Sequence, residues 1–187
     1  MELPRVEGGF RCVVADPPWS FDDKGSRIAP EQAPGGAYRT MTPGAIAALD
    51  VRSVAARDAI LLLWTTSAHL VDGTAARVAD AWGFTPKTTM AWVKRGPTGK
   101  LQIGMGHYTR AAHELVVLAA RGSPLILARN VPSVFEAPRT RHSAKPEGLQ
   151  DLAERLTAGP FLELFARRGR PGWTCWGDQL EVGEVGT

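Results

Sequence analysis

The stretch "VVADPPWSF" (residues 13–21) is the most informative part of the sequence, because an apolar run is followed there by an acid, two prolines and a tryptophan. Proline has no N–H group to donate, so two prolines in a row cannot continue the hydrogen-bond ladder of a sheet. We therefore expect a strand that ends at Asp16 and a stiff corner after it. The corner presents a carboxylate and a large aromatic ring, either as a simple turn or as the rim of an active site.

Outward from this corner, further apolar runs alternate with helical patterns. Several runs are continuously apolar, which is typical of strands buried on both faces. The alternation predicts an α/β fold with a mostly parallel sheet and helices on both faces. Thr42 is expected to cap the first helix, with Pro43 in its first turn, and Gly83 to close the second. The further strands are expected at residues 59–65, 88–94, 114–120, 133–137, 161–167 and 172–177, and the helices at residues 42–50, 67–84 and 145–157.

Length and composition indicate an ordinary globular protein with one domain, residues 1–187, of which 44% are hydrophobic and 22% charged. No apolar run reaches the roughly 20 residues of a membrane span, and the first residues lack the apolar core of a signal peptide, so we expect a cytoplasmic protein without a membrane segment. Cys12 and Cys175 lie in apolar runs and are expected to be reduced core residues. We expect no metal site, because metal-ligand spacing is absent among the four histidines, His69, His107, His113 and His142.

The net charge is only +3, but several basic residues gather in two loop-like stretches, "KRGPTGK" (residues 94–100) and "APRTRHSAK" (residues 137–145). These stretches are either solvated loops or a rim that contacts phosphates, and charge alone does not decide between the two. Two long segments without a clear pattern, residues 20–38 and 96–110, are expected to be binding loops or lids. In a doubly wound sheet, ligands lie beyond the carboxyl ends of the strands, which is where Asp16 is expected.

The Asp-Pro-Pro-Trp corner has the groups needed to bind a planar base that carries an amino group. The exocyclic amine of adenine is a poor nucleophile, because its lone pair is delocalised into the ring. A carboxylate and a rigid proline carbonyl that accept its two hydrogens would return electron density to the nitrogen. An adjacent tryptophan offers a face for stacking, at about 1–3 kcal/mol per base. The alternative is a strand end with a proline turn and a core tryptophan, and the motif alone leaves both open.

The motif "DPPW" (residues 16–19) resembles the catalytic motif of amino-group adenine methyltransferases, which use S-adenosylmethionine. The rest of the chain, from Phe10 to about Leu180, resembles one branch of them, the MT-A family of the catalytic subunit of the eukaryotic mRNA N6-adenosine methyltransferase. The joint order of the motifs carries this resemblance. They are "YRTM" (residues 38–41), "LLLWTTSAHL" (61–70), "GMGHYTRAAHELVVLAARG" (104–122), "RHSAKPEGLQDLAERL" (141–156) and "FLELFARRGRPGWTCWGDQ" (161–179).

The resemblance implies a role for each matching residue. Asp16 and Pro17, with Pro18 in the same motif, would hold the target amine, and Trp19 would wall the base pocket. Tyr38 would lie close to the target base, and Lys145 would lie near both the substrate and the cofactor. The residues that would contact the cofactor are Asp16, Lys145, Glu163, Leu164, Phe165, Arg167, Asp178 and Gln179. The alternatives are a solvated lysine before a helix, a core segment at residues 162–165 and a simple turn at residues 177–179.

The resemblance further implies a Rossmann-like methyltransferase fold with a permuted motif order, and methyl transfer to the N6 amine of adenine in nucleic acid. The compact chain favours DNA over RNA as substrate. The alternatives are an RNA N6-adenosine methyltransferase or a non-catalytic nucleic-acid-binding subunit. So small a chain leaves no separate domain for target recognition, so we expect a homodimer or a partner subunit. Two departures stand out: many family members have Asn at the position of Asp178, and the glycine-rich GxGxxG fingerprint is absent.

Overall fold

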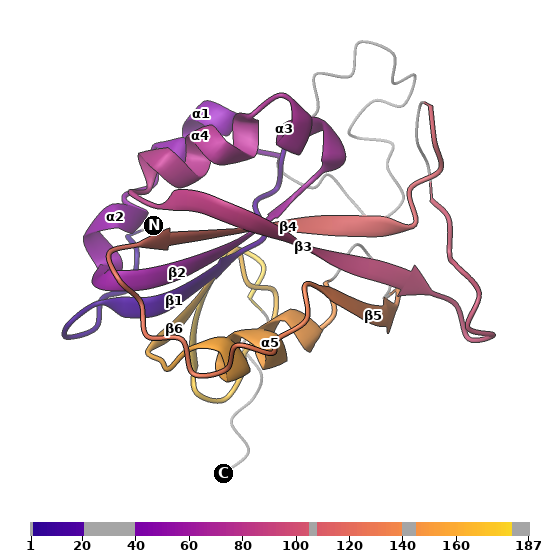
Figure 1. The fold of residues 1–187 in the computed structure, drawn as a ribbon. Helices are drawn as coiled ribbons and strands as arrows, with labels where there is room; N and C mark the ends of the chain where they lie inside the picture. Colours follow the sequence, from indigo (N-terminus) through magenta and orange to yellow (C-terminus); the bar gives the residue numbers. More distant parts are fainter. Residues whose placement is uncertain (1, 21–39, 105–107, 140–144, 181–187) are drawn as a thin grey trace.

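The computed structural model describes residues 2–20, 40–104, 108–139 and 145–180 (Figure 1). They form a seven-stranded sheet with the strand order β5-β3-β4-β2-β1-β6-β7. Four of the six neighbouring strand pairs in this part of the chain are parallel, and β4 runs antiparallel to both of its neighbours. The expected α/β class with a mostly parallel sheet is therefore confirmed. The strands are β1 (Phe10–Ala15), β2 (Ala55–Thr65), β3 (Thr85–Arg95), β4 (His113–Arg121), β5 (Val134–Pro138), β6 (Phe161–Leu164) and β7 (Trp173–Trp176).

Helices cover both faces of the sheet: in Figure 1, α1, α3 and α4 lie above it and α5 lies below. Thr42 caps α1 as expected, since its Oγ1 accepts a hydrogen bond from Ala45 N at 3.2 Å, and Pro43 follows as the first helical residue. The helices are α1 (Pro43–Ala47), α2 (Val51–Val54), α3 (Ser67–Val71), α4 (Thr74–Ala81) and α5 (Gly148–Leu156).

The single helix expected over residues 67–84 is wrong, because the chain forms two helices there, α3 and α4. Gly73 separates them with φ +77°, a left-handed conformation that ends a helix. The Asp72 carboxylate then accepts a hydrogen bond from Thr74 N at 2.7 Å and starts α4 anew. The helix expected over residues 42–50 also ends early, at Ala47.

The core lies on both faces of the sheet, and β1 contributes to each. Val13 and Ala15 pack in the cluster beneath α1 and α4, whereas Cys12 and Val14 pack in the cluster around Leu149 of α5. This alternation confirms that the continuous apolar run of β1 is buried on two sides. Cys12 and Cys175 are both free thiols, as expected, and burial raises the pKa of Cys12 to about 12.

The directions of the strands bring several chain segments to one edge of the sheet. The carboxyl ends of β1, β2, β6 and β7 lie at this edge, because these strands are parallel. The amino end of β4 lies there too, since β4 is antiparallel and Thr65 at the end of β2 pairs with Leu115. A residue at the start of β4 therefore reaches the same place as a residue after the end of β1.

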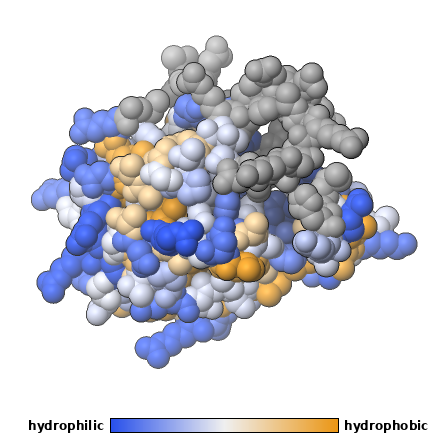
Figure 2. Space-filling view, turned by 90° about the horizontal axis from the view of Figure 1, so that it is seen from above, coloured by the Kyte–Doolittle hydropathy of each residue, from blue (hydrophilic) through white to orange (hydrophobic). Residues whose placement is uncertain are grey.

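The surface above the helix layer shows hydrophilic residues spread around limited apolar areas (Figure 2). Among the described residues, no helix is long and apolar enough to cross a membrane. The same part of the chain shows no group of three or more His, Cys, Asp or Glu side chains that could hold a metal ion.

Candidate active site

The Asp-Pro-Pro-Trp corner follows β1 directly, as the sequence predicts, and backbone hydrogen bonds hold it. Pro17 O accepts from Trp19 N at 2.8 Å, and Pro18 O accepts from Met41 N at 2.7 Å. Trp19 also forms an isolated parallel bridge with Met41. The corner is thus fixed by the proline rings and by the chain at residue 41, so the Asp16 side chain is carried on a rigid base.

Trp19 anchors this corner in the core. Its side chain is buried, its Nε1 donates to Trp64 O at 3.0 Å, and its ring lies 5.0 Å from the ring of His69 between centroids. These contacts tie the corner to the end of β2 and to α3. The role of Trp19 as a stacking wall for a base stays a prediction.

Asp16 lies at one end of a row of alternating charges at this edge of the sheet. The Nζ atom of Lys145 lies 2.9 Å from Asp16 Oδ1 and 3.0 Å from Oδ2. The same Nζ lies 3.3 Å from Oε2 of Glu114, whose Oε1 lies 2.7 Å from Nζ of Lys94. The order of charges is therefore Asp16, Lys145, Glu114, Lys94.

Aromatic rings line the two lysines of this cluster. Lys145 Nζ lies 5.4 Å from the ring centroid of Trp64, and Lys94 Nζ lies 5.2 Å from that of Trp92. An ammonium group over an indole face gains a cation–π attraction, which is larger where water is scarce. The rings thus restrict where the ammonium groups can lie and leave the carboxylates as their polar partners.

The pKa values of the cluster follow from burial and from these neighbours. Burial raises the pKa of the Asp16 carboxyl above its ordinary value, although the Lys145 ammonium acts in the opposite direction. Burial alone would also raise the pKa of Glu114, but Lys145 and Lys94 together hold it below its ordinary value. Burial lowers the pKa of Lys145, yet the two carboxylates outweigh this and hold it above its ordinary value. Lys145 is therefore a firmly charged ammonium group between two acids.

Sequence reasoning missed Glu114 and misplaced Lys94. Glu114 lies at the amino end of β4, and only the antiparallel direction of this strand brings it to the edge that holds Asp16. Both alternatives for the stretch at residues 94–100 place Lys94 in an exposed loop, but its side chain is 13% exposed and paired with Glu114. We correct this expectation: Lys94 belongs to the charge cluster.

The end of β6 forms the other side of the site. Asp16 N donates to Leu164 O at 3.4 Å, which joins the corner to this strand. The strand then stops at Leu164, earlier than the sequence predicts, because Phe165 has φ +62° and turns the chain. A non-glycine residue in this conformation costs about 1–2 kcal/mol. The Phe165 ring packs edge-on against Trp176, and a side chain at Gly177 would collide with the backbone of Ala166.

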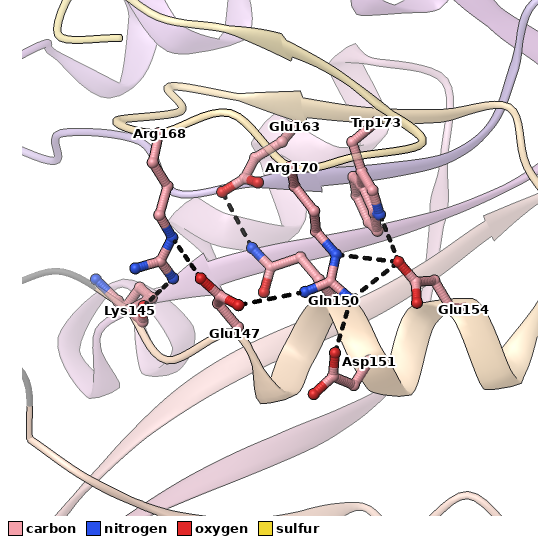
Figure 3. A network of polar contacts seen from close by, with 9 residues as sticks. All are labelled: Lys145, Glu147, Gln150, Asp151, Glu154, Glu163, Arg168, Arg170 and Trp173. Carbon is pink, nitrogen blue, oxygen red and sulfur yellow. Dashed lines mark hydrogen bonds and ion pairs between the residues drawn. The ribbon is translucent and has the colours of Figure 1, made fainter. Parts of the chain in front are cut away.

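A network of polar contacts joins α5 to the segment between β6 and β7 (Figure 3). Arg170 contacts three carboxylates, with distances of 3.6 Å to Glu147, 2.7 Å to Asp151 and 3.0 Å to Glu154. Arg168 pairs with Glu147 at 3.0 Å, and its Nη2 donates to Lys145 O at 3.1 Å. The network therefore fixes the backbone at Lys145 relative to β6 and β7.

The remaining predicted residues lie around this centre at different depths. Glu163 lies within β6, beside β1, and is half-buried. Arg167 is half-buried, and its positive charge acts on Asp16 to lower the pKa of that carboxyl. Asp178 and Gln179 lie in an exposed turn after β7. Tyr38, His107 and His142 lie outside the described residues, as do most of the long segment at residues 20–38 and residues 140–144 of the second basic stretch.

The fold and the site together define an α/β enzyme domain in which an acid–lysine pair lies at the carboxyl edge of a mostly parallel sheet, beside a second carboxylate at the start of β4. Residues 10–179 match the MT-A70 family. The chain belongs to this family, and it is an N6-adenine methyltransferase. The family relationship expected from the sequence motifs is thus confirmed.

Three relatives show how far the similarity extends. The type II methyltransferase M.MunI of a Mycoplasma species is 30% identical over 202 residues, which cover 98% of this chain and 82% of the relative. The N(6)-adenine-specific methyltransferase METTL4 of Mus musculus is 25% identical over 185 residues, or 91% of this chain and 37% of the relative. The human N(6)-adenosine-methyltransferase catalytic subunit METTL3 is 28% identical over 184 residues, which cover 94% of this chain and 29% of the relative. The chain thus spans most of M.MunI but only about a third of the two mammalian relatives.

Proposed function

We propose that this protein transfers a methyl group from S-adenosylmethionine to the N6 amine of adenine in DNA. The observation that carries the proposal is the Asp16–Lys145 pair on the Asp-Pro-Pro-Trp corner. DNA is favoured over RNA by the similarity to M.MunI, which covers 98% of this chain. The order of the motifs, with the acid corner on β1 and the cofactor residues at the end of β6, supports a permuted arrangement of the Rossmann-like methyltransferase fold.

The residues at this edge fit S-adenosylmethionine in their chemistry. Glu163 and Asp178 offer carboxylates to hydroxyl and ammonium donors, and Arg167 and Gln179 offer donors to the carboxylate and the adenine ring of the cofactor. Gly177 keeps the backbone between β7 and Asp178 free of a side chain. S-adenosylmethionine, when bound, supplies the methyl group as an electrophile. Leu164 and Phe165 form the floor of this part of the site.

Asp16 and Pro17 orient the target amine. One hydrogen of the amine is accepted by a carboxylate oxygen of Asp16 and the other by Pro17 O, which has a second lone pair beside the one used by Trp19 N. When the amine nitrogen bonds to the methyl carbon, the bond from that carbon to sulfur would break and leave S-adenosylhomocysteine, and the proton that the amine loses would pass to an Oδ atom of Asp16. Burial raises the pKa of Asp16, which favours this transfer, while the Lys145 ammonium acts in the opposite direction and favours the charged carboxylate. Orientation and exclusion of water therefore provide most of the catalysis.

The test is mass spectrometry of nucleosides from plasmid DNA and from total RNA, with and without expression of the protein. We expect N6-methyldeoxyadenosine in DNA, and none above background with the variant Asp16→Ala. Methylation of RNA alone would replace DNA by RNA as the substrate. No methylated adenine in either, together with no thermal shift on adding S-adenosylhomocysteine, would overturn the proposal and favour a non-catalytic subunit.

We further infer that the active form is a homodimer or needs a partner subunit. Specific readers of DNA bury about 1,000–2,500 Å² of protein surface, and most of this chain is used for the sheet and its helices. A second subunit would supply the missing surface. Sedimentation with and without a DNA duplex measures the stoichiometry, and a monomer that methylates one strict sequence with high affinity would contradict the inference.

A further inference from the structure

Gln150 is a buried polar residue that none of the sequence motifs assigns to the site. It lies on α5, its side chain is buried, and its Nε2 donates to Oε1 of Glu163 at 3.1 Å. The other amide atom, Oε1, is buried and has no hydrogen-bond partner among the described residues. Figure 3 shows the side chain reaching from α5 to Glu163 on β6.

A buried amide lowers the stability of the fold at a position where α5 needs only an apolar side chain to pack on the sheet. The neighbouring buried residues of α5 are Leu149, Leu152 and Ala153, which pack against the sheet. A buried carbonyl without a partner has lost its hydrogen bonds to water, and an apolar side chain of the same shape would avoid this cost. The amide is therefore not explained by the stability of α5. The hydrogen bond from its side chain to Glu163 offers an explanation.

Other charged groups face Glu163 from each neighbouring element, but they are engaged elsewhere. Arg168 and Arg170, from the segment after β6, pair with carboxylates of the α5 region. Asp16 at the end of β1 repels the Glu163 carboxylate, and Cys175 faces it from β7 as a thiol with a raised pKa. The hydrogen bond from Gln150 is thus a direct contact that orients the carboxylate.

We propose that Gln150 is a positioning residue of the cofactor site, which holds the Glu163 carboxylate charged and oriented toward the hydroxyl or ammonium donors of S-adenosylmethionine. This inference rests on the proposed function. A hydrogen bond to the charged form of a carboxyl lowers its pKa, and here it opposes burial, which raises the pKa of Glu163. Without Gln150, the pKa of Glu163 rises further, and the carboxyl protonates at a higher pH.

The variant Gln150→Met tests the proposal, because it keeps the length of the side chain and removes both the carbonyl and the NH2 group of the amide. Calorimetric titration with S-adenosylhomocysteine over a pH series measures the Kd. We expect the Kd to rise roughly tenfold at neutral pH, and the acid-side loss of affinity to move to higher pH. Gln150→Glu places a like charge beside Glu163 and is expected to move the midpoint further.

Thr157→Val is the matched control. Thr157 is also buried at α5 and loses one hydrogen bond, from its Oγ1 to Leu125 O at 3.0 Å, but it does not contact Glu163. We expect this variant to lower the free energy of unfolding and to leave the Kd and its pH midpoint unchanged. Gln150→Met should change the free energy of unfolding little, because the loss of the unpaired carbonyl offsets the loss of the hydrogen bond to Glu163.

A double-mutant cycle with Glu163→Gln decides whether Gln150 acts through Glu163. We expect Glu163→Gln to abolish the pH dependence, and the added change Gln150→Met to weaken binding no further. Additive effects, or an unmoved pH midpoint in Gln150→Met and Gln150→Glu, would overturn this inference while leaving the proposed function intact. No binding of S-adenosylhomocysteine by the wild type would overturn both.

Discussion

Lys145 Nζ contacts both carboxylate oxygens of Asp16, at 2.9 and 3.0 Å, although the two residues are 129 positions apart in the chain. One ammonium group therefore fixes the rotation of the carboxylate as well as its charge. The third contact of this ammonium group, to Glu114, fixes its position from a second direction. The acid that would meet the substrate is thus held by its side chain as well as by the backbone of the proline corner.

Asp16→Ala is expected to remove methylation almost completely, by at least a factor of about 10², because the variant has no group that orients the amine or takes its proton. Cofactor affinity should stay within a few-fold of the wild type. Single-turnover rates and calorimetry with S-adenosylhomocysteine measure the two effects. Asp80→Asn, at an exposed position of α4, is the control with unchanged rate. A fully active Asp16→Ala variant would refute the mechanism.

Lys145→Met is expected to move the acid limb of the pH–rate profile to higher pH. Lys145 lowers the pKa of Asp16, so its removal raises that pKa and protonates the acid earlier as the pH falls. Lys94→Met is the comparison, since Lys94 contacts Glu114 but shows no contact to Asp16 among the described residues. An acid limb that moves equally in both variants would show that the shift does not come from the Asp16–Lys145 contact.

Glu114→Gln is expected to lower the free energy of unfolding by about 1–2 kcal/mol at neutral pH, a figure already reduced for partial exposure. The folded-state pKa of Glu114 lies below its ordinary value of 4.5, so its charged form contributes stability above that pH. This contribution is lost as the pH falls through the folded-state pKa. The difference between wild type and variant should therefore vanish in acid, as measured by denaturant unfolding at several pH values. Glu136→Gln, which breaks an exposed pair with Arg95, should have a smaller effect.

Arg167→Ala is expected to weaken the binding of S-adenosylmethionine, because it removes a charge-assisted contact. Calorimetric titration of the wild type and the variant measures this effect. Arg155→Ala, on the last turn of α5, is the control with unchanged affinity. Equal affinity in wild type and Arg167→Ala would refute the assignment of Arg167 to the cofactor site.

Neutralising Lys100 and Arg139 together is expected to weaken binding to many DNA sequences alike and to flatten the salt dependence. Both side chains are exposed, in contrast to Lys94. Each lost phosphate contact should reduce the slope of log K against log salt by about 0.9. Arg57→Gln, at the opposite end of β2, is the control. A salt slope that is equal in all three proteins would show that these two loops do not contact phosphates.

The sequence was sufficient to predict the Asp16 corner and the lysine beside it, because two prolines end a strand wherever they occur and the motifs are specific. It could not predict Glu114, since an apolar run reads the same in either direction and only pairing with β2 and β3 shows that β4 is reversed. The motif was equally compatible with a Trp19 ring exposed to a base and with a Trp19 ring packed in the core. Gln150 gave no signal, because one polar residue in a helical pattern is ordinarily a surface residue.

The strand order also suggests where the chain could be split into two fragments that complement each other. A cut between Thr98 and Gly99, in the exposed connection after β3, would leave Asp16 on one piece and Glu114, Lys145 and Glu163 on the other. Because β4 lies between β3 and β2, and β6 pairs with β1, neither piece alone contains a completed sheet. Two such fragments, fused to a pair of interacting proteins, would regain methylation only on association. The resulting methyl mark on DNA would be a lasting record that the two fusion partners had met.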